Sequence, residues 1–193
     1  IDVQAVVLTS SETLSRLAAG TLDVGLVALP QVAVAGLHIR PWRRDPVCAF
    51  VPSDWAVPKV VTPAWLAARP LILNDATTRL SRLTSDWFAR AGLQPRARIE
   101  LNYNDAIKSL VAAGWGAALL PHEAGAAEAD ARIVRRPLRP ALWRPLALAW
   151  RDGADDGATR QVLAVLEGLR QAPNGARVNP RSGASASLRP ARG

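Results

Sequence analysis

The sequence predicts an α/β protein, because two stretches of it combine a capped helix with a buried strand in one short unit. One stretch covers residues 9–30, and the other covers residues 102–121, NYNDAIKSLVAAGWGAALLP. In each, apolar residues recur at helical spacing, a glycine follows the helix, and an apolar run ends at a proline. Two copies of one unit suggest two lobes of similar architecture.

The first unit begins near the amino end of the sequence. Val3–Leu8 is expected to form a buried strand. Thr9 and Glu12 have the spacing of a capping box, in which the hydroxyl caps a free amide and the acid reaches back. An apolar stripe then predicts a helix that ends at Gly20, and Val24–Leu29 predicts a second strand.

The middle of the chain is expected to alternate short strands and helices. Thr62 and Pro63 suit the cap and first position of a helix, since proline lacks a backbone donor that is unused there anyway. Asn74–Thr78 reads as a polar turn before a helix with one apolar side. The expected elements are strand Val47–Val51, helix Pro63–Ala68, strand Leu71–Leu73, helix Arg79–Ala91 and strand Ala97–Leu101.

The second unit follows these elements. Asn102 and Asn104 are expected to cap a helix that ends at Gly114, and Ala117–Leu120 predicts a buried strand. Three tryptophans are expected in core or hinge packing, namely Trp42, Trp115 and Trp150. Beyond the unit we expect helix Glu123–Arg132, a connection Ile133–Leu138, strand Leu146–Trp150, helix Ala158–Leu169 and a disordered tail from Gln171.

Composition limits the class of protein. The chain has 193 residues, enough to bury a core, and no apolar run approaches the roughly 20 residues that span a bilayer. Cys48 is the only cysteine, which excludes an internal disulfide and fits a cytoplasmic location. The formal net charge is +8, but no helix-turn-helix is evident, so the charge is better explained by solvated surface and a basic tail.

The sequence contains no motif of a known catalytic or metal site. G-x-S-x-G, the Walker loop, H-E-x-x-H and C-x-x-C are all missing from it. Gly114–Gly116 follows a helix rather than opening one, which is the wrong context for binding a dinucleotide. The two histidines, His38 and His122, lie far apart in the sequence and are expected to be structural. We therefore expect no enzyme activity, no cofactor and no metal.

Four blocks of sequence resemble the effector-binding domain of LysR-type transcriptional regulators. In order they are VQAVVLTSSETLSRLAAGTLDVGLVALP, GLHIRPWRRDPVCAFVPSDW, VTPAWLAARPLILND and LNYNDAIKSLVAAGWGAALLP. The resemblance implies a type II periplasmic-binding-protein-like fold, with two Rossmann-like lobes, two crossover strands and a small-molecule cleft. It divides the chain into lobe I at 1–49 and 135–170, lobe II at 50–134 and a disordered tail at 171–193.

The resemblance also implies a function. Domains of this family bind a small metabolite, often a carboxylate, and pass a change in lobe orientation to a winged helix-turn-helix through a homodimer or homotetramer. Because family members carry that DNA-binding part, a strand and a helix ahead of the first block, we expect a fragment or processed product. Its first lobe is expected to be truncated, with an unpaired strand edge, and it is expected to meet DNA only through the missing part and to meet no membrane.

The predicted ligand site combines three polar turns that the resemblance places around one cleft. Helix N-termini at the carboxyl ends of strands offer free amides and a partial positive charge. Helix capping alone could also explain these side chains, and Arg79 is either a partner for a ligand carboxylate or a solvated first-turn residue. The predicted ligand-binding residues are Thr9, Ser10, Ser11, Asn74, Thr77, Thr78, Arg79, Asn102 and Asn104.

Two other functions fit the same fold. One is a transport-type solute-binding protein, which the absence of a signal peptide and the block from Gly36 to Pro52 disfavour. The other is an enzyme with a catalytic group in the cleft, for which Asp75 with Thr77 or Thr78 is the only candidate.

Overall fold

The computed structural model describes residues 2–122, 130–153 and 156–171. Its helices are α1 (Ser10–Ala18), α2 (Pro63–Ala67), α3 (Arg79–Ala89), α4 (Asn104–Ala112) and α5 (Gly157–Gly168), which continues into the 3-10 turn η1 (Leu169–Gln171). Its strands are β1 (Val24–Ala28), β2 (Leu37–Pro52), β3 (Leu71–Leu73), β4 (Ile99–Glu100), β5 (Ala117–Pro121) and β6 (Ile133–Arg151). They form one mixed sheet in the order β1-β6-β2-β5-β3-β4.

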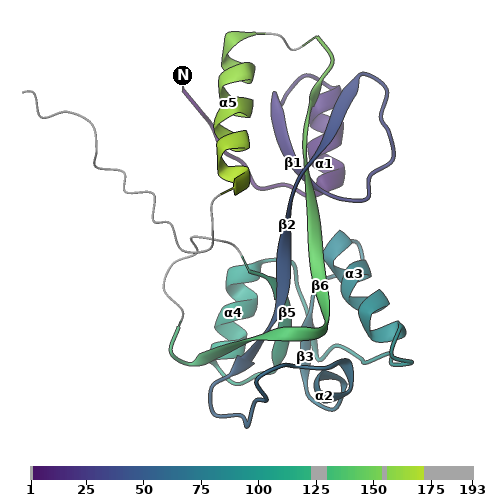
Figure 1. Cartoon of the computed structure of the whole chain (residues 1–193), viewed down its shortest axis with the longest axis vertical. Coiled ribbons are helices and arrows are strands. Elements are labelled where there is room, and N and C mark those ends of the chain that lie inside the picture. Colours follow the sequence, from purple (N-terminus) through teal and green to yellow (C-terminus); the bar gives the residue numbers. More distant parts are fainter. Residues whose placement is uncertain (1, 123–129, 154–155, 172–193) are drawn as a thin grey trace, which may run out of the picture.

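The elements gather in two groups, which are the two lobes (Figure 1). Lobe I contains α1, β1 and α5, and lobe II contains α2, α3, α4, β3, β4 and β5. Only β2 and β6 pass from one lobe to the other, and they pair antiparallel along most of their length. This arrangement is the two-lobed α/β fold with two crossover strands that the sequence predicts.

The two connecting strands are longer than the sequence pattern indicates. β2 has 16 residues and β6 has 19, whereas the apolar runs predict only Val47–Val51 and Leu146–Trp150. The rest of each strand contains prolines and arginines, which interrupt the alternation of apolar and polar residues that predicts a strand. The predicted connection Ile133–Leu138 is therefore wrong, because it belongs to β6.

Each lobe buries its own apolar clusters against the sheet. In lobe II, α2 and α3 cover the face that carries Val47, Ala49 and Val51, and α4 covers the face of Cys48 and Phe50. In lobe I, one cluster packs beneath α1, and a smaller one joins Trp42 of β2 to α5. Residues that alternate along a strand point to opposite faces, so both faces of the sheet are used.

Several local predictions are confirmed. Thr9 and Glu12 form the capping box, and the hydroxyl of Thr62 accepts a hydrogen bond from the Trp65 amide. Gly20 and Gly114 adopt φ values of 73° and 79° in the left-handed region where the helices end. Capping depends on neighbouring residues alone, which explains why sequence reasoning places helix ends well.

The predicted strand Val3–Leu8 is wrong. The segment is not paired with any described strand, and Val7 is 95% exposed. It runs beside β1 and α5, where it lines a cavity of about 350 Å³ together with Val162 and Leu166. β1 pairs with β6 on one side and with no described strand on the other, so the segment passes a free strand edge without pairing with it.

Other boundaries differ from the predictions. The strand predicted over Ala97–Leu101 is reduced to β4, and Trp115 is 47% exposed rather than packed in a core or hinge. Trp42 is buried as predicted, while Trp150 is half-buried and stacks on His38. Most of the predicted helix Glu123–Arg132 and the tail 172–193 lie outside the described residues, and no described helix is long and apolar enough to cross a membrane.

Candidate functional site

The first polar turn lies at the edge of lobe I that faces lobe II. Ser10 begins α1, and its hydroxyl accepts a hydrogen bond of 3.0 Å from the Ala28 amide at the end of β1. The next amide, of Leu29, donates to the carbonyl of Pro145 in the connecting strand β6 at 2.9 Å. The N-terminus of α1 is therefore fixed beside the point where the strands leave the lobe.

The second polar turn precedes α3 in lobe II and is held by its own side chains. A carboxylate oxygen of Asp75 accepts hydrogen bonds from the amide and the hydroxyl of Thr77, at 2.8 Å and 2.6 Å. These bonds stabilise the charged form and hold the pKa of Asp75 below its usual value. Thr78 caps α3 by accepting from the Ser81 amide at 3.1 Å, so Asp75 shapes the turn and does not cap the helix.

The third polar turn contacts the second and differs from the prediction. Asn102 does not cap α4, because its side-chain oxygen accepts a hydrogen bond of 3.0 Å from the Asp75 amide. Asn104 is the first residue of α4, and the cap position is held by Tyr103, whose side chain makes no capping hydrogen bond. Among the five described α-helices, α4 alone begins without a side-chain cap.

One hydrogen bond crosses from lobe II to lobe I. Arg79, the first residue of α3, donates to the side-chain oxygen of Gln31 at 3.4 Å. Gln31 follows β1 and donates its amide to the Ala28 carbonyl at 2.6 Å. Arg79 is half-buried and faces the other lobe through this hydrogen bond.

Gln31 is a further candidate residue that the sequence reasoning misses. It comes directly after the strand that Pro30 ends, and the carboxyl end of a strand is where the other candidate turns lie. Because no helix begins there, no capping motif draws attention to it. The same rule, applied to every strand rather than to capped helices alone, selects it.

Only some of the nine predicted residues form a hydrogen bond to another turn or to the other lobe. Ser10 accepts from the Ala28 amide, and Arg79 donates to Gln31, which in turn donates to the Ala28 carbonyl. Asn102 joins the third turn to the second. Asn74 is buried, while Ser10, Thr78, Arg79 and Asn104 are half-buried and the others are exposed.

Two cavities lie elsewhere in the described part of the protein. One of about 290 Å³ lies between residues 52–54, the C-terminal end of α4 and Arg132, and the other is the cavity beside residues 3–8. Neither is lined by any of the nine predicted residues, so the site is defined by its polar groups.

The candidate catalytic group predicted from the sequence, Asp75 with Thr77, lies in the second polar turn. No group of three His, Cys, Asp or Glu among residues 2–122, 130–153 and 156–171 is placed to hold a metal ion. The pair Asp75 and Thr77 is in hydrogen-bond contact, but a carboxylate with a lowered pKa is a weak base toward a hydroxyl.

Two α/β lobes joined by a strand pair, with polar helix starts turned toward one another, define a small-molecule binding domain of the periplasmic-binding-protein type. The chain belongs to the family described as the LysR substrate binding domain, whose family model matches residues 1–171. The resemblance of the four blocks is therefore confirmed. Domains of this family are regulatory rather than catalytic.

Solved structures share this fold at low sequence identity. The reduced OxyR regulatory domain from Pseudomonas aeruginosa is 23% identical, with a TM-score of 0.70 over 84% of this chain and 78% of that chain. The CcmR regulatory domain of Synechocystis in complex with 2-PG is 18% identical, with a TM-score of 0.73 over 85% and 81%. Full-length OxyR C199D from Pseudomonas aeruginosa is 21% identical, with a TM-score of 0.68 over 85% of this chain but 53% of that chain.

This chain therefore spans about half the length of such full-length regulators. No curated protein matches the sequence.

Proposed function

We propose that this domain senses a small metabolite, of the carboxylate class, which binds between the two lobes and changes their orientation. The residues proposed to contact it are the nine of the three turns, together with Gln31. The observation that carries the proposal is the pair of links between turns, Arg79 with Gln31 across the lobes and Asp75 with Asn102 within lobe II.

The charges of the site support an anionic ligand. Arg79 offers a planar guanidinium that donates to a neutral amide oxygen at 3.4 Å, a long hydrogen bond that a carboxylate could replace with shorter, charge-assisted ones. The uncapped start of α4 adds free backbone amides on the same side of lobe II. Asp75 opposes an anion, but its carboxylate already accepts hydrogen bonds from two donors of the turn, the amide and the hydroxyl of Thr77.

The regulatory step is a population shift. A ligand moves the lobes only if it binds one arrangement more tightly than the other. A carboxylate that replaced the Gln31 oxygen as the partner of Arg79 would bind one arrangement more tightly. The reason is that the carboxylate can contact both lobes in only one relative orientation.

The rest of the regulatory protein is part of the same proposal. We infer a cytoplasmic homodimer or homotetramer in which another part of the protein contacts DNA, and in which residues 1–49 and 135–170 act as lobe I and residues 50–134 as lobe II. Family membership supports a regulator over a transport protein or an enzyme.

A thermal-shift screen of small carboxylates tests the ligand site. A ligand present at a hundred times its dissociation constant stabilises the folded state by about 2.7 kcal/mol. Arg79→Gln should abolish the shift, while Arg82→Gln, on the exposed side of the same helix, should retain it. A hit that survives Arg79→Gln with unchanged affinity would place the ligand elsewhere.

A further inference from the structure

The two connecting strands contain a short central ribbon, Arg43–Val47 paired with Leu142–Leu146, between two irregularities. β2 holds one extra residue at Pro41/Arg43, and the register then jumps at Val47/Cys48, where Val47 pairs with Leu142 but Cys48 pairs with Pro137. Bulges interrupt the ladder on both sides of the ribbon. Its ends still pair with the lobes, Val47 with Pro121 of β5 and Leu146 with Ala28 of β1, whereas its middle, Arg44–Pro46 opposite Trp143–Pro145, pairs with no strand outside the ribbon among the described residues.

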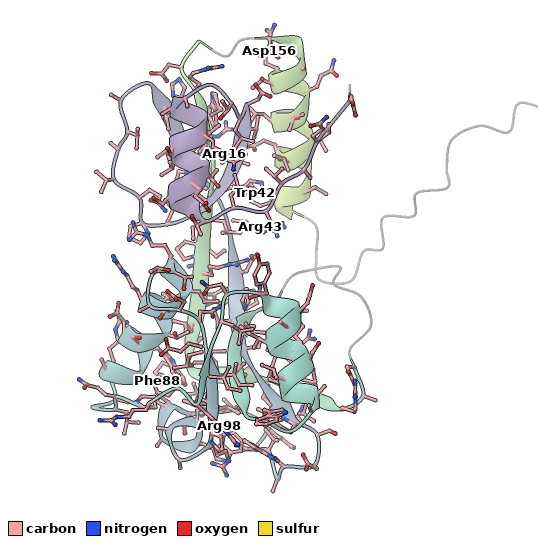
Figure 2. All side chains as sticks on the ribbon, turned by 180° about the vertical axis from the view of Figure 1, so that it is seen from behind. Arg16, Trp42, Arg43, Phe88, Arg98 and Asp156 are labelled. Carbon is pink, nitrogen blue, oxygen red and sulfur yellow. The ribbon has the colours of Figure 1, made fainter. Side chains whose placement is uncertain are left out.

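Each irregularity is tied firmly to its own lobe. The indole of Trp42 donates to the Leu166 carbonyl of α5 at 2.8 Å, which fixes the irregularity at Pro41/Arg43 to lobe I. The indole of Trp87 in α3 donates to the Pro140 carbonyl at 2.8 Å, which fixes the irregularity at Val47/Cys48 to lobe II. Figure 2 places Trp42 and Arg43 where β2 leaves lobe I. Relative motion of the lobes must therefore be taken up by the ribbon between these anchors.

The two prolines of the ribbon face away from the pairing of its strands. The Pro46 carbonyl accepts a hydrogen bond from the His122 amide at 2.8 Å, and the Pro145 carbonyl accepts one from the Leu29 amide at 2.9 Å. Because the N–H and C=O groups of one strand residue point to the same side, the donors that these prolines lack would also have pointed outward. The outer edges of the ribbon are therefore bonded to the lobes, and a contact between side chains joins its own two strands.

Asp45 supplies this contact. It is only 5% exposed, and it lies directly opposite Arg144 in the pairing. One carboxylate oxygen lies 2.8 Å from the Arg144 guanidinium across the strands, and the other lies 3.0 Å from Nε of Arg43 on its own strand. Arg43 in turn packs over the Trp42 ring, with 4.3 Å from its guanidinium carbon to the ring centroid. The carboxylate thus links both strands to the lobe I anchor.

We propose that Asp45 is a positioning residue that sets the relative orientation of the two lobes by clamping Arg144 and Arg43 in the ribbon. Without it, the guanidinium groups of Arg43 and Arg144 would lose the carboxylate that lies between them and would repel one another. The proposal rests on the lobe motion of the proposed function, but it requires no ligand to test.

The test measures the distance between lobes by pulsed electron paramagnetic resonance on the ligand-free chain. Spin labels on Ser15→Cys in α1 and Ser85→Cys in α3, both exposed, report across the lobes in a Cys48→Ala background. Asp45→Asn should broaden this distance distribution, whereas a pair within lobe II, Ser85→Cys and Ser109→Cys, should keep its width. An unchanged inter-lobe distribution in Asp45→Asn would overturn the proposal.

Two further variants keep the test decisive. Arg144→Gln leaves Asp45 its contact with Arg43 and removes the cross-strand contact, so it should broaden the inter-lobe distribution even where Asp45→Asn fails to fold.

Asp152→Asn is the control. It removes an exposed carboxylate that contacts His38 away from the ribbon, and its inter-lobe distribution should match the parent. Equal broadening in Asp152→Asn, or none in Arg144→Gln, would contradict a clamp at the ribbon. A missing ligand in the carboxylate screen leaves this measurement unaffected, so the two proposals fail separately.

Discussion

Lobe I and lobe II each contain a unit of a helix followed by a strand, but they bury it to different extents. β5 of lobe II is buried along its whole length, while β1 of lobe I alternates and exposes Leu26. α3 contributes four buried residues and α5, of similar length, contributes only Thr159. The reason is position in the sheet, since β5 has a strand on each side and β1 lies at the edge.

The comparison shows that a helical stripe does not determine burial by itself. α1 and α5 both carry apolar faces, yet the buried clusters beneath them contain five and three residues, against twelve and seven in lobe II. Hydrophobic stabilisation scales with the apolar area removed from water, so lobe II should contribute most of the stability of the chain.

The largest expected effect is on the lobe II core. Phe88→Ala removes a ring that is 2% exposed between α3 and the sheet, and should lower the free energy of unfolding by about 3–5 kcal/mol. Urea denaturation measures it. Val165→Ala on α5, 64% exposed, is the control and should change stability by about 0.5 kcal/mol or less.

A matched leucine pair sharpens the comparison of the lobes. Leu66 in α2 and Leu17 in α1 are both 0% exposed, so the transfer free energy lost on truncation to alanine is the same. Leu→Ala costs about 2–5 kcal/mol, and we expect Leu66→Ala near the top of that range and Leu17→Ala near the bottom, because the smaller cluster can close around the cavity. Equal losses in urea denaturation would contradict the difference between lobes.

Helix caps should behave alike in the two lobes, because they depend on local geometry. Thr9→Ala in lobe I and Thr78→Ala in lobe II each remove a hydroxyl that accepts from a backbone amide, at 3.2 Å and 3.1 Å. Each should cost about 1 kcal/mol of unfolding free energy. A loss confined to lobe II would show that burial, and not capping, decides the effect.

Acid should destabilise the chain slightly through carboxylates in both lobes. Arg132 lowers the pKa of Asp130 to about 2 from 3.8, and Thr159 lowers the pKa of Asp156. The unfolded chain therefore takes up protons first, so this stabilisation is present above pH 4 and is lost as the pH falls toward 2. Urea midpoints at pH 5 and pH 3 should differ less in Asp130→Asn than in the parent.

The contrast between local and tertiary determinants also explains what the sequence predicts. Thr9 and Thr62 are predicted as caps because the bonding partner lies three residues away, and the Thr78 cap has the same spacing within the predicted polar turn. Asn102 has cap chemistry, but its oxygen is taken by Asp75, 27 residues distant, which no local pattern reveals. Val3–Leu8 has strand composition but lacks a paired neighbour, and pairing is a property of the sheet.

The site follows the same division. The polar turns are predicted because each lies at the start of a helix. Gln31 and Arg79 are 48 residues apart, and Asp45 and Arg144 are 99 residues apart, so local sequence does not reveal either contact. The connecting strands are underestimated for the same reason, since Pro46 and Pro145 are accommodated because they face outward from the strand pair, where their carbonyls accept from the His122 and Leu29 amides.

The central claim is that a carboxylate bound between the lobes changes their orientation. The most direct test is the Ser15→Cys and Ser85→Cys distance measured with and without the carboxylate selected by the thermal-shift screen. The account predicts that the ligand shifts the inter-lobe distance to a new mean in the parent and not in Arg79→Gln. A ligand that binds with full affinity while the distance distribution stays the same would contradict it.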